Sequence, residues 1–73
     1  MTELGEYDIV ALIEDIPEEN LVKGEVGTIV NYLAPGVFLV EFADDDGVTY
    51  ALPVVREEQL SLIVLDKSRI DSY

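Results

Sequence analysis

The acidic run Asp44-Asp45-Asp46-Gly47 holds the residue types that come nearest to metal chemistry in this sequence. Calcium binds about six to eight oxygen ligands, and a loop of the EF-hand kind ends on a glutamate. Counted from Asp44, that last position holds Val55, whose side chain has no oxygen. Because an Asp-Gly step is the strongest short signal for a β-hairpin turn, we predict a hairpin loop here and no metal site.

Paired carboxylates at residues 18–19 and 57–58 are the other groups that could act in catalysis, as a general acid and a general base. That role requires a cleft that shifts their pKa values, whereas adjacent acids on a polar loop are usually just hydrated. The sequence has no histidine and no cysteine, so its hydroxyls lack an evident activating base. Residues 24–28 lack the Lys-Ser/Thr end of a phosphate loop. We therefore expect a protein that is not an enzyme, with no catalytic residue and no cofactor.

The charge of the chain is strongly one-sided, with 16 Asp and Glu residues, 4 Lys and Arg residues and a formal net charge of −12. Such a surface repels phosphate backbones and anionic membranes, so we expect neither direct nucleic-acid binding nor membrane binding. It attracts a basic protein and speeds the encounter with it. The alternative interpretation is that the acids only keep a small domain soluble.

Several short segments rich in β-branched and aromatic residues must position these groups, and their composition favours strands. The predicted strands cover residues 7–13, 26–33, 37–42, 48–52 and 60–65. Residues 14–20 are polar and form a loop, and the short segment 54–59 fits a single 3-10 turn. Pro53 indicates a strand end or a sheet edge. Together these elements predict an all-β fold, a small five-stranded and partly open barrel with a 3-10 turn before the last strand.

Residues 37–42 show the clearest alternation of the sequence, which assigns one face of this strand to the core. The residues expected in the core are Phe38, Val40, Phe42, Val10 and Leu12, together with one face of residues 48–52. Gly24 fits a turn with positive φ, and Gly27 fits a bulge or a close backbone crossing.

The chain is expected to form one domain over residues 1–65 and a solvated tail over residues 66–73, because termini fray unless they are tied down. Its start is acidic and lacks the apolar stretch of a signal peptide. Pro35 interrupts the longest uncharged run, so no segment is expected to span a bilayer. A cytoplasmic location is the resulting expectation.

Three pieces of the sequence occur in an order that resembles a known family. They are Asp8-Ile9-Val10-Ala11-Leu12 with Asp15-Ile16-Pro17 and Leu21-Val22-Lys23-Gly24; the stretch from Gly24 to Val30; and Val40-Glu41-Phe42 before the acidic Asp-Gly hairpin. The family consists of short uncharacterised bacterial proteins, often cyanobacterial, that are catalogued as a domain of unknown function. The similarity covers residues 7–65 and implies an SH3-like barrel, with no catalytic residues to carry over. KOW-like relatives of this fold often bind RNA, but this chain lacks the basic residues that such binding needs.

Residues 60–65 are apolar on both faces, and a small barrel can bury only one of them. The other face, with Ile63 and Leu65, must contact the tail, a second copy of the chain or a partner. Acids on the early loop and on the hairpin would contact basic residues of that partner. The candidate partner-binding residues are therefore Glu14, Asp15, Glu18, Glu19, Asp44, Asp45, Asp46, Ile63 and Leu65.

These features favour a non-catalytic protein-interaction module, in particular an acidic antitoxin-like or regulatory partner of a basic protein. The alternatives are a small structural or accessory subunit of a larger enzyme complex, a DNA-mimic inhibitor, and a homo-oligomer that forms through the last strand. Tyr7, Tyr32, Tyr50 and Tyr73 could add a binding surface, or they could lie half-buried at the barrel rims with their hydroxyls in water.

Overall fold

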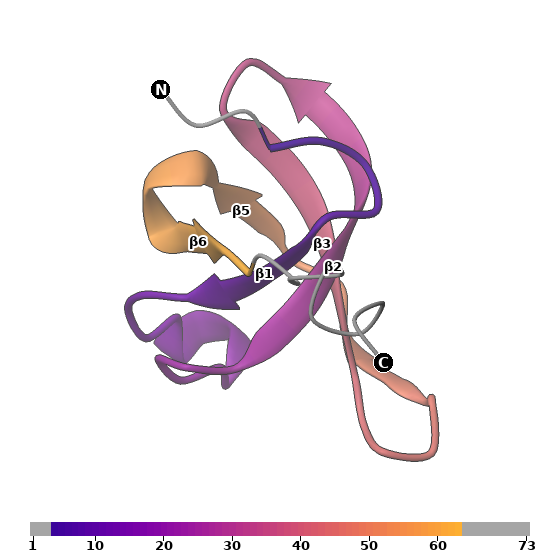
Figure 1. The fold of residues 1–73 in the computed structure, drawn as a ribbon. Helices are drawn as coiled ribbons and strands as arrows, with labels where there is room; N and C mark the ends of the chain where they lie inside the picture. The colour runs from indigo at the N-terminus through magenta and orange to yellow at the C-terminus, as the bar shows by residue number, and fades with distance from the viewer. Residues whose placement is uncertain (1–3, 64–73) are drawn as a thin grey trace, which may run out of the picture.

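A computed structural model describes residues 4–63, which form a sheet of six antiparallel strands that stays open (Figure 1). The strands are β1 Ile9–Leu12, β2 Val26–Ala34, β3 Val37–Ala43, β4 Thr49–Ala51, β5 Val54–Arg56 and β6 Leu60–Leu62. Two 3-10 turns complete the described chain, η1 Pro17–Glu19 in the loop after β1 and η2 Glu57–Gln59 before β6. The predictions of an all-β fold and of a 3-10 turn before the last strand are thus confirmed. Within this part of the chain, no helix has the length and apolar character that crossing a membrane requires.

Strand order explains why the structure has six strands where the sequence predicted five. The order is β4-β3-β2-β1-β6, and β5 also pairs with β3. The start of β3, residues 37–39, pairs with β5, while its end, residues 42–43, pairs with β4. The extra strand β5 lies in the segment that was expected to form only a polar turn. Its two valines favour a strand, and its pairing with β3 completes it.

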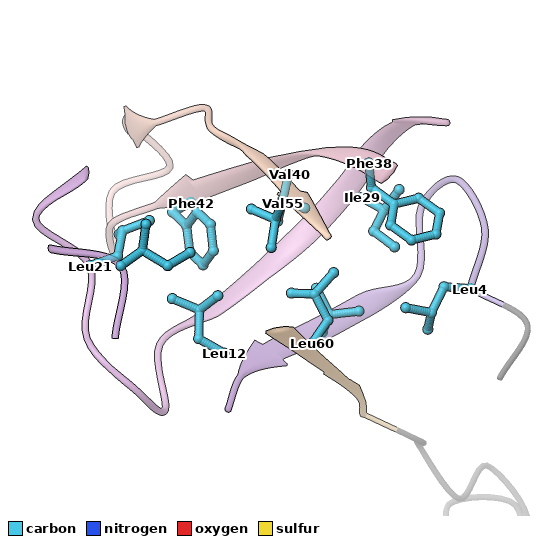
Figure 2. Packing of buried hydrophobic residues seen from close by; sticks show 11 residues of the cluster. Leu4, Leu12, Leu21, Ile29, Phe38, Val40, Phe42, Val55 and Leu60 are labelled. Carbon is cyan, nitrogen blue, oxygen red and sulfur yellow. The ribbon is translucent and has the colours of Figure 1, made fainter. Parts of the chain in front are cut away.

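The core lies between the two halves of the bent sheet (Figure 2). The buried apolar residues of the described chain are Leu4, Val10, Leu12, Ile16, Leu21, Ile29, Phe38, Val40, Phe42, Val55 and Leu60. All five core residues that were predicted by name are among them, which confirms the register of β3.

The predicted burial of one face of residues 48–52 is wrong. Val48, Tyr50 and Leu52 are 59%, 53% and 51% exposed, and only Ala51 packs against the core. The pairing of β4 with β3 is irregular, with a register shift between Phe42 and Ala43. Because this short strand also ends the sheet, the apolar residues that flank Ala51 lie outside the core.

Gly27 marks a point where β2 passes very close to β3. A Cβ atom at this position would lie 2.8 Å from the Glu41 carbonyl oxygen and 2.9 Å from side-chain carbons of both Phe42 and Val40. Of the two explanations that the sequence allowed for Gly27, the close crossing therefore holds, since the register shifts of β2 occur further along the strand. Gly24 has φ of 96°, as its predicted turn position requires.

Candidate protein-interaction surface

The acids of the loop between β1 and β2 are anchored at separate points. Glu14 accepts a hydrogen bond of 3.2 Å from the side-chain amide of Gln59, which places it beside η2. Asp15 accepts one of 2.7 Å from the backbone N–H of Lys23, which ties the two arms of the loop together. The remaining two acids, Glu18 and Glu19, are exposed on η1. Glu14 and Asp15 thus brace the loop locally, and Glu18 and Glu19 remain exposed.

The hairpin acids adopt the predicted turn. Asp44 Oδ1 accepts hydrogen bonds from the backbone N–H groups of Asp46, at 2.9 Å, and Val48, at 3.0 Å. Gly47 takes a positive φ of 82°, and Asp45 and Asp46 are exposed. Among residues 4–63, no three acidic side chains are grouped closely enough to hold a metal ion. Figure 1 shows the hairpin projecting away from the loop that carries η1, so the two sets of predicted acids do not form one continuous face.

A hydrogen bond between Tyr50 and Glu25 links the base of the hairpin to the start of β2. The Tyr50 hydroxyl donates to Glu25 Oε1 at 2.6 Å, and the Val22 N–H donates to Glu25 Oε2 at 2.9 Å. These two bonds, the Tyr50 bond first, lower the pKa of the Glu25 carboxyl. The same bond raises the pKa of the Tyr50 hydroxyl, and desolvation and the charges of Glu25 and Asp44 add to that rise. Repulsion among neighbouring carboxylates would raise the pKa of the Glu25 carboxyl. The pKa is instead lowered, because the two hydrogen bonds outweigh that effect.

Removing the Tyr50 hydroxyl should raise the pKa of Glu25. In the Tyr50→Phe variant, titration followed by NMR should show the Glu25 carboxyl moving up toward 4.5, its ordinary value. Because Glu25 has a lowered pKa only in the folded state, its contribution is present above the ordinary value and is lost as the pH falls through the folded pKa. The pair is exposed, so the expected loss of stability at neutral pH is below about 1 kcal/mol. An unchanged Glu25 titration would show that the two side chains do not interact in solution.

Apolar side chains cover the outer face of the sheet where β3 meets β5. Val54 lies opposite Leu39, which alternates along β3 with buried residues and therefore faces away from the core. Leu52 and Val54 flank the buried Pro53 and are 51% and 60% exposed. Val37 precedes Leu39 by two positions on the same face, and both are half-buried. We call Val37, Leu39, Leu52 and Val54 the β3–β5 patch.

Acidic groups lie at both ends of the β3–β5 patch. Glu41 follows Leu39 by two positions on the outer face of β3 and accepts a hydrogen bond from the Thr49 hydroxyl. At the other end, the N–H of Glu57 donates to the Gly36 carbonyl at 2.8 Å, next to Val37. Arg56 lies opposite Val37, and its guanidinium pairs with Glu58 at 3.0 Å. The patch is therefore an apolar strip with Glu41 at one end and Glu57 and the Arg56–Glu58 pair at the other.

Sequence reasoning missed Leu52 and Val54 as surface residues. The signal that could have found them is Pro53, which marks a sheet edge and has a large apolar residue on each side. Alternation along β3 already assigned Val37 and Leu39 to the face opposite the core.

The last strand contributes less to the candidate partner-binding surface than the sequence predicted. The N–H of Ile63 donates to the Ile9 carbonyl at 2.9 Å, so Ile63 continues the pairing of β6 with β1 and is half-buried. Leu60 is buried, and Leu62 is 39% exposed. The other predicted residue of this strand face, Leu65, lies outside the described residues.

The tyrosines differ in exposure. Tyr7, Tyr32 and Tyr50 are 75%, 49% and 53% exposed, so all three are more exposed than the half-buried rim position that was one of the two expectations. The Tyr32 ring meets Phe38 edge-on, with 5.7 Å between the ring centroids. Tyr73 lies outside the described residues.

Residues 6–62 match the model of the family described as domain of unknown function DUF4926. Because this match covers most of the 73 residues, the chain belongs to that family. No curated protein and no solved structure matches the chain.

Proposed function

We propose that this chain is a non-catalytic protein-interaction module that binds a basic partner protein, as an antitoxin or a regulatory subunit does. The observation that carries the proposal is the β3–β5 patch, an exposed apolar strip with carboxylates at both ends. Exposed apolar strips rimmed by polar groups are typical of protein-binding surfaces. The net charge of −12 favours a partner of opposite sign.

We also propose that the open sheet is an SH3-like barrel. In its support, a long loop follows β1, tight hairpins join β2 to β3 and β3 to β4, and a 3-10 turn precedes β6. The long early loop, the turns and the 3-10 turn were predicted from the sequence pattern, and the family resemblance implied an SH3-like barrel. The bacterial and cytoplasmic setting expected from the sequence belongs to the same proposal.

The partner can be identified by capture from the native cell with the full chain as bait, and its association rate can then be measured against salt. We expect the rate to fall at least about tenfold as salt rises from low to a few tenths molar, because salt screens the attraction. The melting temperature of the chain alone should rise over the same series, because salt also screens repulsion among its own acids. If the acids serve only solubility, the melting temperature rises while the association rate hardly changes.

A pair of matched variants separates position from net charge. Asp45→Asn with Asp46→Asn removes two charges from the hairpin and keeps Asp44, which caps the turn. Glu18→Gln with Glu19→Gln removes the same charge from η1. If electrostatic steering assists binding, at least the variant whose substituted residues lie nearer the binding surface should associate more slowly. Both variants should melt at or above the temperature of the parent chain, because each removes two repelling charges. Parent-like association rates in both variants would contradict the functional role of the acids.

A further inference from the structure

We propose, building on the function above, that the outer edge of β5 accepts an extended basic segment of the partner, which joins the sheet as an added strand beside Leu52–Arg56.

Backbone geometry leaves this edge open to pairing. The Val40 N–H donates to the Pro53 carbonyl at 3.0 Å, and Val55 lies opposite Phe38, so residues 53 and 55 point their backbone groups toward β3. In an antiparallel ladder successive residues point these groups to alternate sides. The N–H and C=O groups of Leu52 and Val54 therefore point away from β3. Within residues 4–63, β5 pairs with no strand other than β3.

Pro53 does not block this edge, although proline is a common way to protect one. Its carbonyl faces β3, so the position of its missing N–H also faces β3 rather than the edge. The pairing segment is short, because the N–H of Arg56 already donates to Gln59 Oε1 at 2.9 Å. A partner strand of about three to four residues fits this length, and main-chain bonds of this kind are how many domains bind extended peptides.

Side chains on the outer face decide which strand would fit. Leu52 and Val54, each more than half exposed, would be covered by apolar residues at alternate positions of the incoming strand. The half-buried Leu39 lies opposite Val54 and extends that contact onto β3.

Charge selects a basic partner over a second copy of this chain. Glu41 lies beyond one end of the patch, so a lysine or arginine of the incoming strand would be attracted there. At the other end Glu57 supplies a further carboxylate, whereas Glu58 is already paired with Arg56. A second copy would instead bring another −12 charges to the same surface and be repelled.

The test uses the ¹⁵N-labelled full chain and the synthetic peptide Lys-Thr-Val-Thr-Val-Thr-Lys, whose two lysines share a strand face with its valines. We expect amide signals of residues 52–56 to shift on titration, and exchange of the Val54 amide hydrogen to slow. The same peptide with N-methylated central residues keeps its charge but cannot pair with a strand, so it should bind at least about tenfold more weakly. Equal binding of the two peptides, or shifts that map outside residues 52–56, would overturn strand addition at this edge while leaving a basic partner in place.

Matched double variants test the apolar contact. Leu52→Thr with Val54→Thr should weaken peptide binding about tenfold, since it removes apolar contact area but keeps the β-branched shape at Val54. Val22→Thr with Val26→Thr changes two other exposed valines, 56% and 49% exposed, and should leave binding within about twofold. Melting curves check that both variants fold. If the native partner binds the Leu52/Val54 variant normally, the docking site is wrong and the β3–β5 patch no longer supports the proposed function, which would then rest on the salt dependence of association alone.

Sedimentation of the chain alone tests the competing occupant. We expect a monomer. A dimer that dissociates in the Leu52/Val54 variant would show that a second copy occupies the edge, and it would overturn the basic-segment proposal.

Discussion

Replacing Val40 by aspartate should unfold the domain. The side chain of Val40 is 0% exposed and lies in the centre of β3, opposite Ile29 of β2. An aspartate there either buries a charge or buries a neutral carboxyl without a partner, and either costs several kcal/mol. The lost burial of the valine adds about 1.5–3 kcal/mol. Because domains of this size are stable by roughly 4–11 kcal/mol, the sum approaches or exceeds the whole stability.

The control for this prediction is the same substitution at Val54. That residue lies on the neighbouring strand β5 and is 60% exposed, so Val54→Asp should remain folded. Circular dichroism and the dispersion of the amide proton spectrum report the outcome. A Val40→Asp protein with a cooperative melt close to that of the parent chain would show that Val40 does not face the core, and that the register of β3 is wrong.

The register of β3 could be predicted because one strand carries a strong contrast between its faces. Phe38, Val40 and Phe42 alternate with residues of mixed character, and the observed burial alternates in the same way along the strand. A shift by one residue would have exposed all three, which is why a periodic pattern alone determines the answer.

The same reasoning failed for residues 48–52 because the position of a strand in the sheet decides whether its apolar residues are buried. Val48 and Leu52 have core-like side chains, but β4 is a short end strand with irregular pairing. The types of residues 48–52 do not indicate where their strand lies in the sheet. The strand β5 was missed for a related reason, since its pairing with residues 37–39 spans more than a dozen residues of sequence.

The candidate site was predictable in kind but not in place. The acidity and the hairpin turn could be predicted from the sequence, but local hydrogen bonds determine where the acids lie. Asp15 accepts a bond from the backbone N–H of Lys23, and Asp44 accepts one from the backbone N–H of Val48 in its own hairpin. The Glu25–Tyr50 bond joins residues far apart in sequence, so composition gives no sign of it. The β3–β5 patch likewise depends on which strands meet.

Adding a single methyl group at Gly27 should be the other strongly destabilising change. The position is buried in β2, and a Cβ there would lie 2.8 Å from the backbone carbonyl oxygen of Glu41. Its φ lies outside the left-handed region, so the cost comes from collision rather than from backbone preference. Overpacking of this kind costs about 1–3 kcal/mol or more, whereas the stiffer unfolded chain returns only about 0.4–1 kcal/mol. The net loss is then about 0.6–2 kcal/mol. The Gly27→Ala variant should therefore melt lower by roughly 2–16 °C, at about 4–8 °C per kcal/mol.

Two companions of Gly27→Ala identify the collision that causes the loss. Gly5→Ala adds the same methyl where no atom lies within 4 Å, so it should leave the melting temperature unchanged or slightly raised. Combining Gly27→Ala with Val40→Ala removes the contact of 2.9 Å with the Val40 side chain but keeps the contacts with the Phe42 ring and the Glu41 carbonyl. Because that carbonyl belongs to a paired strand and cannot move aside cheaply, the double variant should be less stable than Val40→Ala alone. If Gly27→Ala costs nothing in the Val40→Ala background, only the contact with the Val40 side chain matters, and β2 does not pass as close to the backbone of β3 as the structure places it.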